Sequence, residues 1–322
     1  RLKSEGRSII YISHKLEELF EISDEITVMR DGTYVGQYPI EEISIDELIK
    51  LMVGRSMENR FPPNEHVVQP NVLLKVENFT SADPHSFKGV SFDLHKGEIL
   101  GIGGLVGAQR TELVESVFGL RSIAEGKLYK NGQEIVNSNP QEAIKNGFAM
   151  LTEERRATGI IPMLSVMDNT LAVAFKAMAG NRFGILNPKK LQTDVEKING
   201  ELNVKTPSVK TAIQNLSGGN QQKVLICRWL LANSDILILD EPTRGIDVGA
   251  KYEIYRIMRE LTKAGKSIIM VSSEMPELIG VSDRIMVMCE GRMTGILDAA
   301  EVEQTDVMTL ATQSENKAKA VD

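Results

Sequence analysis

The sequence contains few cysteines, few aromatic residues and no long hydrophobic run. Its two cysteines, Cys227 and Cys289, lie far apart in a chain of 322 residues, so neither a disulfide framework nor a cysteine metal site is expected. We expect both cysteines to pack as small apolar side chains in a protein of a reducing compartment. No apolar run reaches the length of a transmembrane helix, and no signal peptide pattern opens the sequence. We therefore expect any contact with a membrane to run through a partner.

Positive charge is also scarce. The chain has 37 Lys and Arg against 44 Asp and Glu, a formal net charge of −7, which argues against general affinity for nucleic acid or anionic lipid. Hydrophobic residues make up 42% and charged residues 25% of the chain, the composition of a soluble globular protein with a substantial core. The length exceeds that of one common domain but is short for two large ones.

The most informative stretch of the sequence spans residues 216–250. Within it, the apolar residues 236–239 directly precede Asp240 and Glu241. A short apolar run between polar turns predicts a strand buried on both faces of a parallel sheet. Its carboxylates then lie at the carboxyl end of the strand, where α/β folds place their ligand sites. An ordinary strand end is the alternative for the acidic pair alone.

A glycine pair opens the helix predicted before this strand. The pair lies in Leu216-Ser217-Gly218-Gly219-Asn220, called the signature segment below. The backbone N–H groups and the positive dipole at such a helix start suit an anion such as phosphate. An ordinary turn is the alternative for the glycines alone, but together with the acidic strand end they indicate nucleotide chemistry.

A second glycine-rich turn follows the strand predicted at residues 98–103. This phosphate loop, residues 104–111, lies where the pattern G-x-x-x-x-G-K-[ST] is expected. Gln109 replaces the glycine that phosphate approaches closely, and Arg110 replaces the lysine. We expect a loop that holds nucleotide but is poorly built for hydrolysis, with a ligand-free turn as the alternative. The candidate nucleotide-binding residues here are Gly104, Gly107, Ala108, Gln109, Arg110 and Thr111.

The chain also contains a long internal repeat. Residues 6–36 recur without a gap as residues 265–295, at a constant offset of 259 residues. A repeat of this length, one domain apart, indicates duplication. The two copies differ at one position of chemical interest, where His14 in the first copy corresponds to Ser273 in the second.

These motifs resemble the ATPase domains of ABC transporters. Residues 152–156 (TEERR), 216–223 (LSGGNQQK) and 240–250 (DEPTRGIDVGA) are similar in particular to the tandem ATPases of bacterial monosaccharide importers. The resemblance covers almost the whole chain. It implies an α/β fold of the P-loop NTPase class and ABC type, with a mixed sheet core, an α-helical subdomain and a small antiparallel β subdomain.

The resemblance implies ATP and Mg²⁺ as cofactors. Asp240 and Thr111 would be metal ligands, and Glu241 would polarise the attacking water. His14 matches the family's switch histidine, which binds the γ-phosphate. Ser273 takes its place in the second copy without the reach or charge of imidazole. A surface or packed histidine is the alternative for His14.

Two further positions match family motifs. Glu153 stands where the family usually has its Q-loop glutamine, although a solvated charged face is the alternative for this run of charges. Asp247 corresponds to the D-loop. In this family two ATPase domains close face to face, and each site combines one domain's phosphate loop with the other's signature. The signature segment would then serve the site of His14, whereas the site of residues 72–322 would bind nucleotide more than hydrolyse it.

The repeat and the turn residues suggest a domain plan. We expect residues 1–53 to be the C-terminal remnant of a first ABC ATPase domain, residues 54–71 a linker broken by prolines, and residues 72–322 a second ABC ATPase domain. The helical subdomain should span about residues 140–232. Residues 9–12 are typical of a strand whose neighbours are missing, so this segment should be poorly stabilised.

The implied function is ATP-driven import of a monosaccharide, with galactose or methyl galactoside ahead of ribose, xylose and arabinose. The implied partners are the first ABC domain, membrane permease subunits and, indirectly, a periplasmic or lipid-anchored sugar-binding protein, with no nucleic acid. The protein would be a peripheral ATPase at the cytoplasmic face of the membrane, and this chain alone should be weak or inactive in hydrolysis. The alternatives are a non-transport ABC ATPase of the translation-factor type, disfavoured by the short linker and acidic charge, and a nucleotide-binding regulatory module.

Overall fold

The structure is a computed structural model of the chain. It describes residues 2–12, 16–30, 33–45, 47–48, 51, 61–65, 67–174 and 187–313, and the sequence-based expectation for His14 lies outside these residues.

A six-stranded sheet forms the centre of the main domain, in the order β12-β11-β5-β10-β9-β8. Neighbouring strands run parallel except at the β11–β12 edge, which is antiparallel. The strands predicted at residues 98–103 and 236–239 form β5 and β9, and both β9 and β10 are buried along their whole length. The strands are β5 (Ile99–Gly104), β8 (Phe148–Leu151), β9 (Ile236–Asp240), β10 (Ser267–Val271), β11 (Arg284–Cys289) and β12 (Arg292–Asp298).

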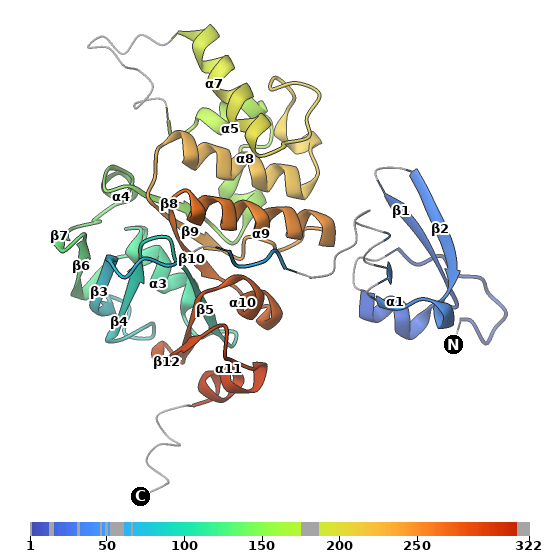
Figure 1. Cartoon of the computed structure of the whole chain (residues 1–322), viewed down its shortest axis with the longest axis horizontal. Coiled ribbons are helices and arrows are strands. Elements are labelled where there is room, and N and C mark those ends of the chain that lie inside the picture. The colour runs from blue at the N-terminus through green and yellow to red at the C-terminus, as the bar shows by residue number, and fades with distance from the viewer. Residues whose placement is uncertain are drawn as a thin grey trace, which may run out of the picture.

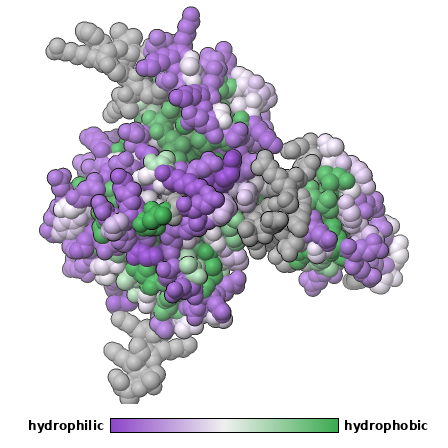
Figure 2. Space-filling view, in the orientation of Figure 1, coloured by the Kyte–Doolittle hydropathy of each residue, from purple (hydrophilic) through white to green (hydrophobic). Residues whose placement is uncertain are grey.

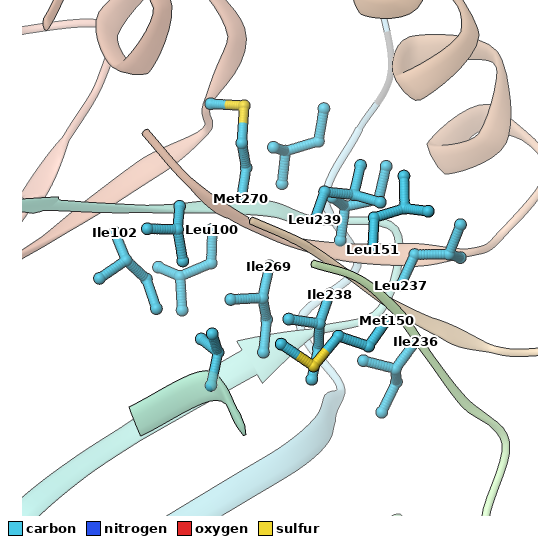
Figure 3. Packing of buried hydrophobic residues seen from close by; sticks show 14 of the residues in the cluster. Leu100, Ile102, Met150, Leu151, Ile236, Leu237, Ile238, Leu239, Ile269 and Met270 are labelled. Atoms are coloured by element: carbon cyan, nitrogen blue, oxygen red, sulfur yellow. The ribbon is translucent and has the colours of Figure 1, made fainter. Parts of the chain in front are cut away.

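Apolar side chains from both faces of this sheet make up the largest core. Figure 3 shows Leu100 and Ile102 of β5 beside Ile269 of β10 and Ile238 of β9, with further aliphatic residues packed around them. Because these strands carry apolar side chains on consecutive residues, the sheet needs helices on its two faces. Those helices are α3 (Arg110–Val117), α4 (Pro140–Lys145), α9 (Val248–Lys263), α10 (Met275–Val281) and α11 (Gln304–Ala311).

A second sheet of four antiparallel strands has the order β4-β3-β6-β7. In this sheet β3 pairs antiparallel with β4, the strand that follows it in the sequence. Backbone N–H of Glu98 donates to the carbonyl of His95 in the turn that leads to β5. The strands are β3 (Val72–Ser81), β4 (Val90–His95), β6 (Ile123–Lys130) and β7 (Gln133–Ile135).

A third part of the main domain is helical. Helices α5 (Val166–Leu171), α7 (Pro188–Glu201) and α8 (Gly218–Leu231) lie together at the top of Figure 1. A separate apolar cluster that includes Leu171, Leu191 and Val195 holds them together. The same stretch of chain contains the short π-helix η2 (Arg155–Gly159) and the 3₁₀ helix η3 (Ile213–Asn215). The predicted range of 140–232 also contains β8, which pairs with β9 in the main sheet. The helices of this part therefore follow β8. Together the three parts confirm the α/β class, with a mixed sheet, helical part and antiparallel sheet.

The N-terminal segment repeats the end of the main domain element by element. Its α1 (Leu16–Ile22), β1 (Glu25–Arg30) and β2 (Thr33–Pro39) have the same bounds, 259 residues earlier, as α10, β11 and β12, and the 3₁₀ turn η1 spans Ile40–Glu42. Both hairpins shift register at the corresponding step, Val28/Met29 and Val287/Met288. The duplicated sequence therefore folds into duplicated structure.

The strand expected at residues 9–12 is not formed. Its counterpart in the second copy is β10, which is paired on both sides, by β5 and β9. Without such neighbours Ile10 is 93% exposed and Ile12 is 92% exposed. Figure 2 shows hydrophobic residues on the visible surface of the N-terminal segment, whereas hydrophilic residues cover most of this face of the main domain.

The described part of the expected linker, residues 61–65 and 67–71, contains no helix or strand and packs on the main domain. The Phe61 ring lies 5.4 Å from that of Tyr255 on α9, and Asn64 donates to Asp283 at 2.8 Å. Among the described helices, none has both the length and the apolar character needed to cross a membrane.

Candidate nucleotide site

The phosphate loop connects β5 to α3 at the carboxyl edge of the main sheet. Gly104 has φ of 152°, and a Cβ at this residue would lie 2.4 Å from the carbonyl oxygen of Met288, so only glycine fits. Gln109 adopts φ of 68° in the left-handed region, where glycine would be unstrained. Its side chain donates back to the Gly107 carbonyl at 3.3 Å and accepts from Ser86 at 2.9 Å. The side chain therefore lies over the loop that a phosphate would approach.

Arg110, the first residue of α3, is turned toward the strand beside it. Its Nη1 donates to the carbonyl oxygen of Ser272 at 2.7 Å. The positive charge of Arg110 lowers the pKa of both Asp240 and Glu241, which partly opposes the rise that burial causes. The Arg110 guanidinium, which is the positive group expected to bind phosphate, is thus present but is hydrogen-bonded to the segment after β10.

Asp240 ends β9 as a buried carboxylate without hydrogen bonds. The residue is 1% exposed, and neither carboxylate oxygen has a partner of ordinary hydrogen-bond geometry. Burial raises the pKa of Asp240 to about 7, a rise that the nearby Thr111 hydroxyl only partly opposes. Orphaned buried oxygens beside a hydroxyl fit a hard divalent cation such as Mg²⁺. Within the described ranges, no cluster of three or more His, Cys, Asp or Glu side chains that could hold a metal ion is found.

Glu241 follows in a strained conformation. Its φ is 47°, and such outliers in non-glycine residues often mark functional sites. Its Oε2 accepts from the Ser273 hydroxyl at 3.2 Å, so the structure brings these two predicted residues together. Burial raises the pKa of Glu241, which suits a group that handles the proton of an attacking water.

Glu153 lies just beyond β8 and faces the same edge of the sheet. Its charge raises the pKa of Asp240 and Glu241, and its role at the site stays a prediction. Its own partner is Arg244, whose Nη1 it binds, while Glu154 lies 3.5 Å from the same nitrogen. The carboxylate is therefore paired, which the solvated-face alternative did not anticipate.

The signature segment opens α8 at a different place from the phosphate loop. Ser217 is the N-cap residue but makes no side-chain cap, and its hydroxyl accepts from Asn220 at 2.9 Å. A Cβ at Gly219 would lie 2.5 Å from that of Ala250 on α9, and one at Gly218 would lie 2.9 Å from Arg155. The N–H groups at the start of α8 are consequently free to bind an anion. Leu216 is buried beneath them.

The remaining predicted residue, Asp247, has a local structural role. Its side chain caps α9 by accepting from the N–H of Ala250 at 2.9 Å. Sequence reasoning missed Thr243, Ser272 and Glu277, which form a buried hydrogen-bonded group beside the site. The repeat held a signal for two of them, because Ser272 and Glu277 match Ser13 and Glu18 in the first copy.

Comparison with known proteins agrees with this geometry. A family model described as ABC transporter matches residues 87–244. The galactose/methyl galactoside import ATP-binding protein of Clostridium tetani is 57% identical over 312 residues, covering 97% of this chain and 62% of the relative. Proteins of the same name from Sodalis glossinidius and Haemophilus influenzae are each 50% identical, and each alignment covers 97% of this chain and 61% of the relative. The chain thus spans about 60% of the length of these relatives.

Solved structures share the fold. An ATP-binding cassette of an ABC transporter aligns with a TM-score of 0.64 at 20% identity, over 75% of this chain and 99% of that one. A nucleotide-free ATP-binding cassette aligns with a TM-score of 0.63 at 18% identity, over 78% of this chain and 99% of that one. These structures show that the chain shares the fold of ATP-binding cassettes, and its residues 87–244 match an ABC transporter ATP-binding domain.

Proposed function

We propose that this chain is part of an ATP-binding subunit that powers import of a monosaccharide, with galactose or methyl galactoside as the sugar. The observation that carries the proposal is the 57% identity with a galactose/methyl galactoside import protein, in a chain whose phosphate loop, Asp240 and Glu241 meet at one sheet edge. The partners would be membrane permease subunits and, indirectly, a sugar-binding protein. The subunit would then lie peripherally at the cytoplasmic face of the membrane.

The nucleotide would be ATP with Mg²⁺. Asp240 and Thr111 would hold the metal, which would neutralise charge on the phosphates. Glu241 would orient and deprotonate the attacking water, and Arg110 would approach the phosphates after leaving the Ser272 carbonyl. Binding would favour closure of two ATPase domains, and closure would act on the permease through the helical part.

The duplication supports a tandem protein with two unequal sites. Residues 1–53 would complete a first ABC domain, and residues 72–322 would form the second. The second site is weakened for hydrolysis by Gln109, Arg110 and Ser273, together with the Glu153–Arg244 pair. The signature segment is intact and would complete the site of the first domain, which also contains His14. This chain alone would bind ATP and hydrolyse it slowly.

An uptake assay tests the sugar and the transport role. In cells lacking their own galactose-importing ATP-binding subunit, expression of the full-length protein should restore uptake of labelled methyl galactoside. Substitution of Asp240→Asn should reduce it strongly, whereas Asp298→Asn, an exposed carboxylate at the far end of β12, should not. Restoration of ribose uptake without galactoside uptake would overturn the sugar assignment, and no uptake of either sugar would overturn the transport role.

A further inference from the structure

Glu277 is a buried carboxylate that the roles above do not use. It lies on α10, is 2% exposed, and forms no ion pair with a basic side chain in the part of the chain that the structure describes. Burial of an unpaired carboxylate is costly unless hydrogen bonds compensate. Its surroundings should therefore explain why the residue is there.

Two hydroxyl groups donate hydrogen bonds to the Glu277 carboxylate, and they come from two different loops. Thr243 Oγ1 donates to Glu277 Oε1 at 2.8 Å, and Ser272 Oγ donates to Oε2. Thr243 follows β9 and lies between Glu241 and Asp247, whereas Ser272 follows β10. One carboxylate thus joins the loops that extend from two adjacent strands at the nucleotide edge of the sheet.

Both loops contact the groups that would act on nucleotide. The carbonyl of Ser272 accepts from Arg110 at 2.7 Å, and the next residue, Ser273, donates to Glu241 at 3.2 Å. The placement of Ser272 therefore affects the cation of the phosphate loop and the predicted water-polarising carboxylate together. Because Glu277 anchors the Ser272 side chain, it influences both without touching nucleotide.

We propose that Glu277 is a positioning residue, which fixes the loop after β9 relative to the loop after β10 and so sets Arg110 and Glu241 for nucleotide binding. The inference rests on the proposed nucleotide function. The repeat supports it independently of the contacts, since Ser13 and Glu18 place the same serine and carboxylate at the same spacing in the first copy. In the tandem protein both domains would then use the same anchor.

The substitution Glu277→Gln tests the proposal with little change in volume. It replaces one acceptor oxygen by an NH₂ group, so one of the two hydroxyl bonds is lost. We expect faster amide hydrogen exchange in residues 241–247 and 272–276. We also expect binding of a fluorescent ATP analogue with Mg²⁺ to weaken about tenfold, the effect of losing one hydrogen bond to a charged group.

Glu98→Gln is the matched control. Glu98 is 0% exposed and is bound by Arg284, at the opposite end of β5 from the phosphate loop. Its substitution should lower the melting temperature without changing nucleotide affinity or the exchange of residues 241–247 and 272–276. Suppose that the two variants lose the same melting temperature and that Glu277→Gln weakens nucleotide binding no more than Glu98→Gln does. Glu277 would then contribute to stability only.

The exchange measurement separates this inference from the proposed function. A wild-type chain that binds no nucleotide overturns the proposed function. Exchange in the nucleotide-free chain then decides the role of Glu277: acceleration confined to the two loops supports it, and unchanged or uniformly faster exchange overturns it. The variants Thr243→Val and Ser272→Ala should each have little further effect in the Glu277→Gln background if all three residues act together.

Discussion

At the scale of single residues, the candidate site depends on contacts between side chains from different elements of the chain. Asp240, Glu241, Glu153 and Ser273 were predicted from motif positions, and the structure gathers them at one sheet edge. The attachment of Arg110 to the Ser272 carbonyl was not predictable, because a side chain's partner depends on tertiary geometry rather than on spacing along the chain.

Gln109 carries a measurable strain. Its left-handed φ of 68° costs a non-glycine residue about 1–2 kcal/mol, so Gln109→Gly should raise the unfolding free energy by about 1 kcal/mol. It should also strengthen ATP binding, because it removes the side chain bonded to Gly107. Denaturant unfolding and nucleotide titration would measure the two effects. Asn203→Gly, at φ of 50° in the helical part, should stabilise without altering affinity. A destabilised Gln109→Gly variant would contradict this view.

Glu277 should make stability depend on pH. Burial raises the pKa of Glu277 above its ordinary value of 4.5, and hydrogen bonds from the Ser272 and Thr243 hydroxyls oppose this rise in part. Among the nearby charges, Glu274 raises the pKa and Lys251 lowers it. Because the folded state then holds the proton more tightly, this group's contribution is full below pH 4.5 and is lost as pH rises through the raised pKa. Melting curves between pH 4 and about 8 should show the wild type losing stability relative to Glu277→Gln. A parallel pH dependence of the two proteins would argue against the raised pKa.

At the scale of elements, strands and long helices were predictable because their patterns are local. The apolar run at residues 236–239 became β9, and the helix predicted to start at the glycine pair became α8. The strand expected at residues 9–12 did not form. Its composition is that of β10, but a strand forms only where another strand is available to pair with it, which the sequence of the strand itself does not supply.

The start of α8 depends on close packing that glycine permits. Because a Cβ at Gly219 would meet the Ala250 Cβ at 2.5 Å, Gly219→Ala should force α8 and α9 apart and lower the unfolding free energy by about 1–3 kcal/mol. Gly200→Ala in α7, where a Cβ meets nothing within 4 Å, should instead stabilise by about 0.5–1 kcal/mol. Chemical denaturation of both variants gives the comparison. Equal effects of the two substitutions would show that the α8–α9 contact is looser than described.

At the scale of the whole molecule, duplication is the organising feature. The N-terminal α1, β1 and β2 repeat α10, β11 and β12 with identical bounds at one offset, yet the two copies have different surroundings. The second copy is part of a complete sheet, whereas the first exposes the residues that would form its central strand. The sequence revealed the repeat, but only the structure shows that β10 is paired on both sides whereas residues 9–12 form no strand.

Limited proteolysis should reveal this difference. Residues 9–12 are extended and include side chains that are more than 90% exposed, as at Ile10 and Ile12, whereas the matching residues 268–271 are buried in β10. We expect a low dose of a broad-specificity protease to cleave within residues 2–12 well before it cleaves the main domain, as mass spectrometry of the fragments would show. Equal resistance of both regions would mean that the first copy is stabilised without the missing strands.

We propose that the site of this chain binds nucleotide while its signature segment activates another site. Phosphate release should be measured for the chain alone and after addition of a first ABC domain with its own phosphate loop and signature. We expect slow release by the chain alone and faster release by the mixture, and the faster release should be lost with Ser217→Ala but retained with Glu241→Gln. Rapid release by the chain alone, or loss of the stimulated rate with Glu241→Gln, would mean that this chain's own site hydrolyses ATP and that the two sites do not differ as proposed.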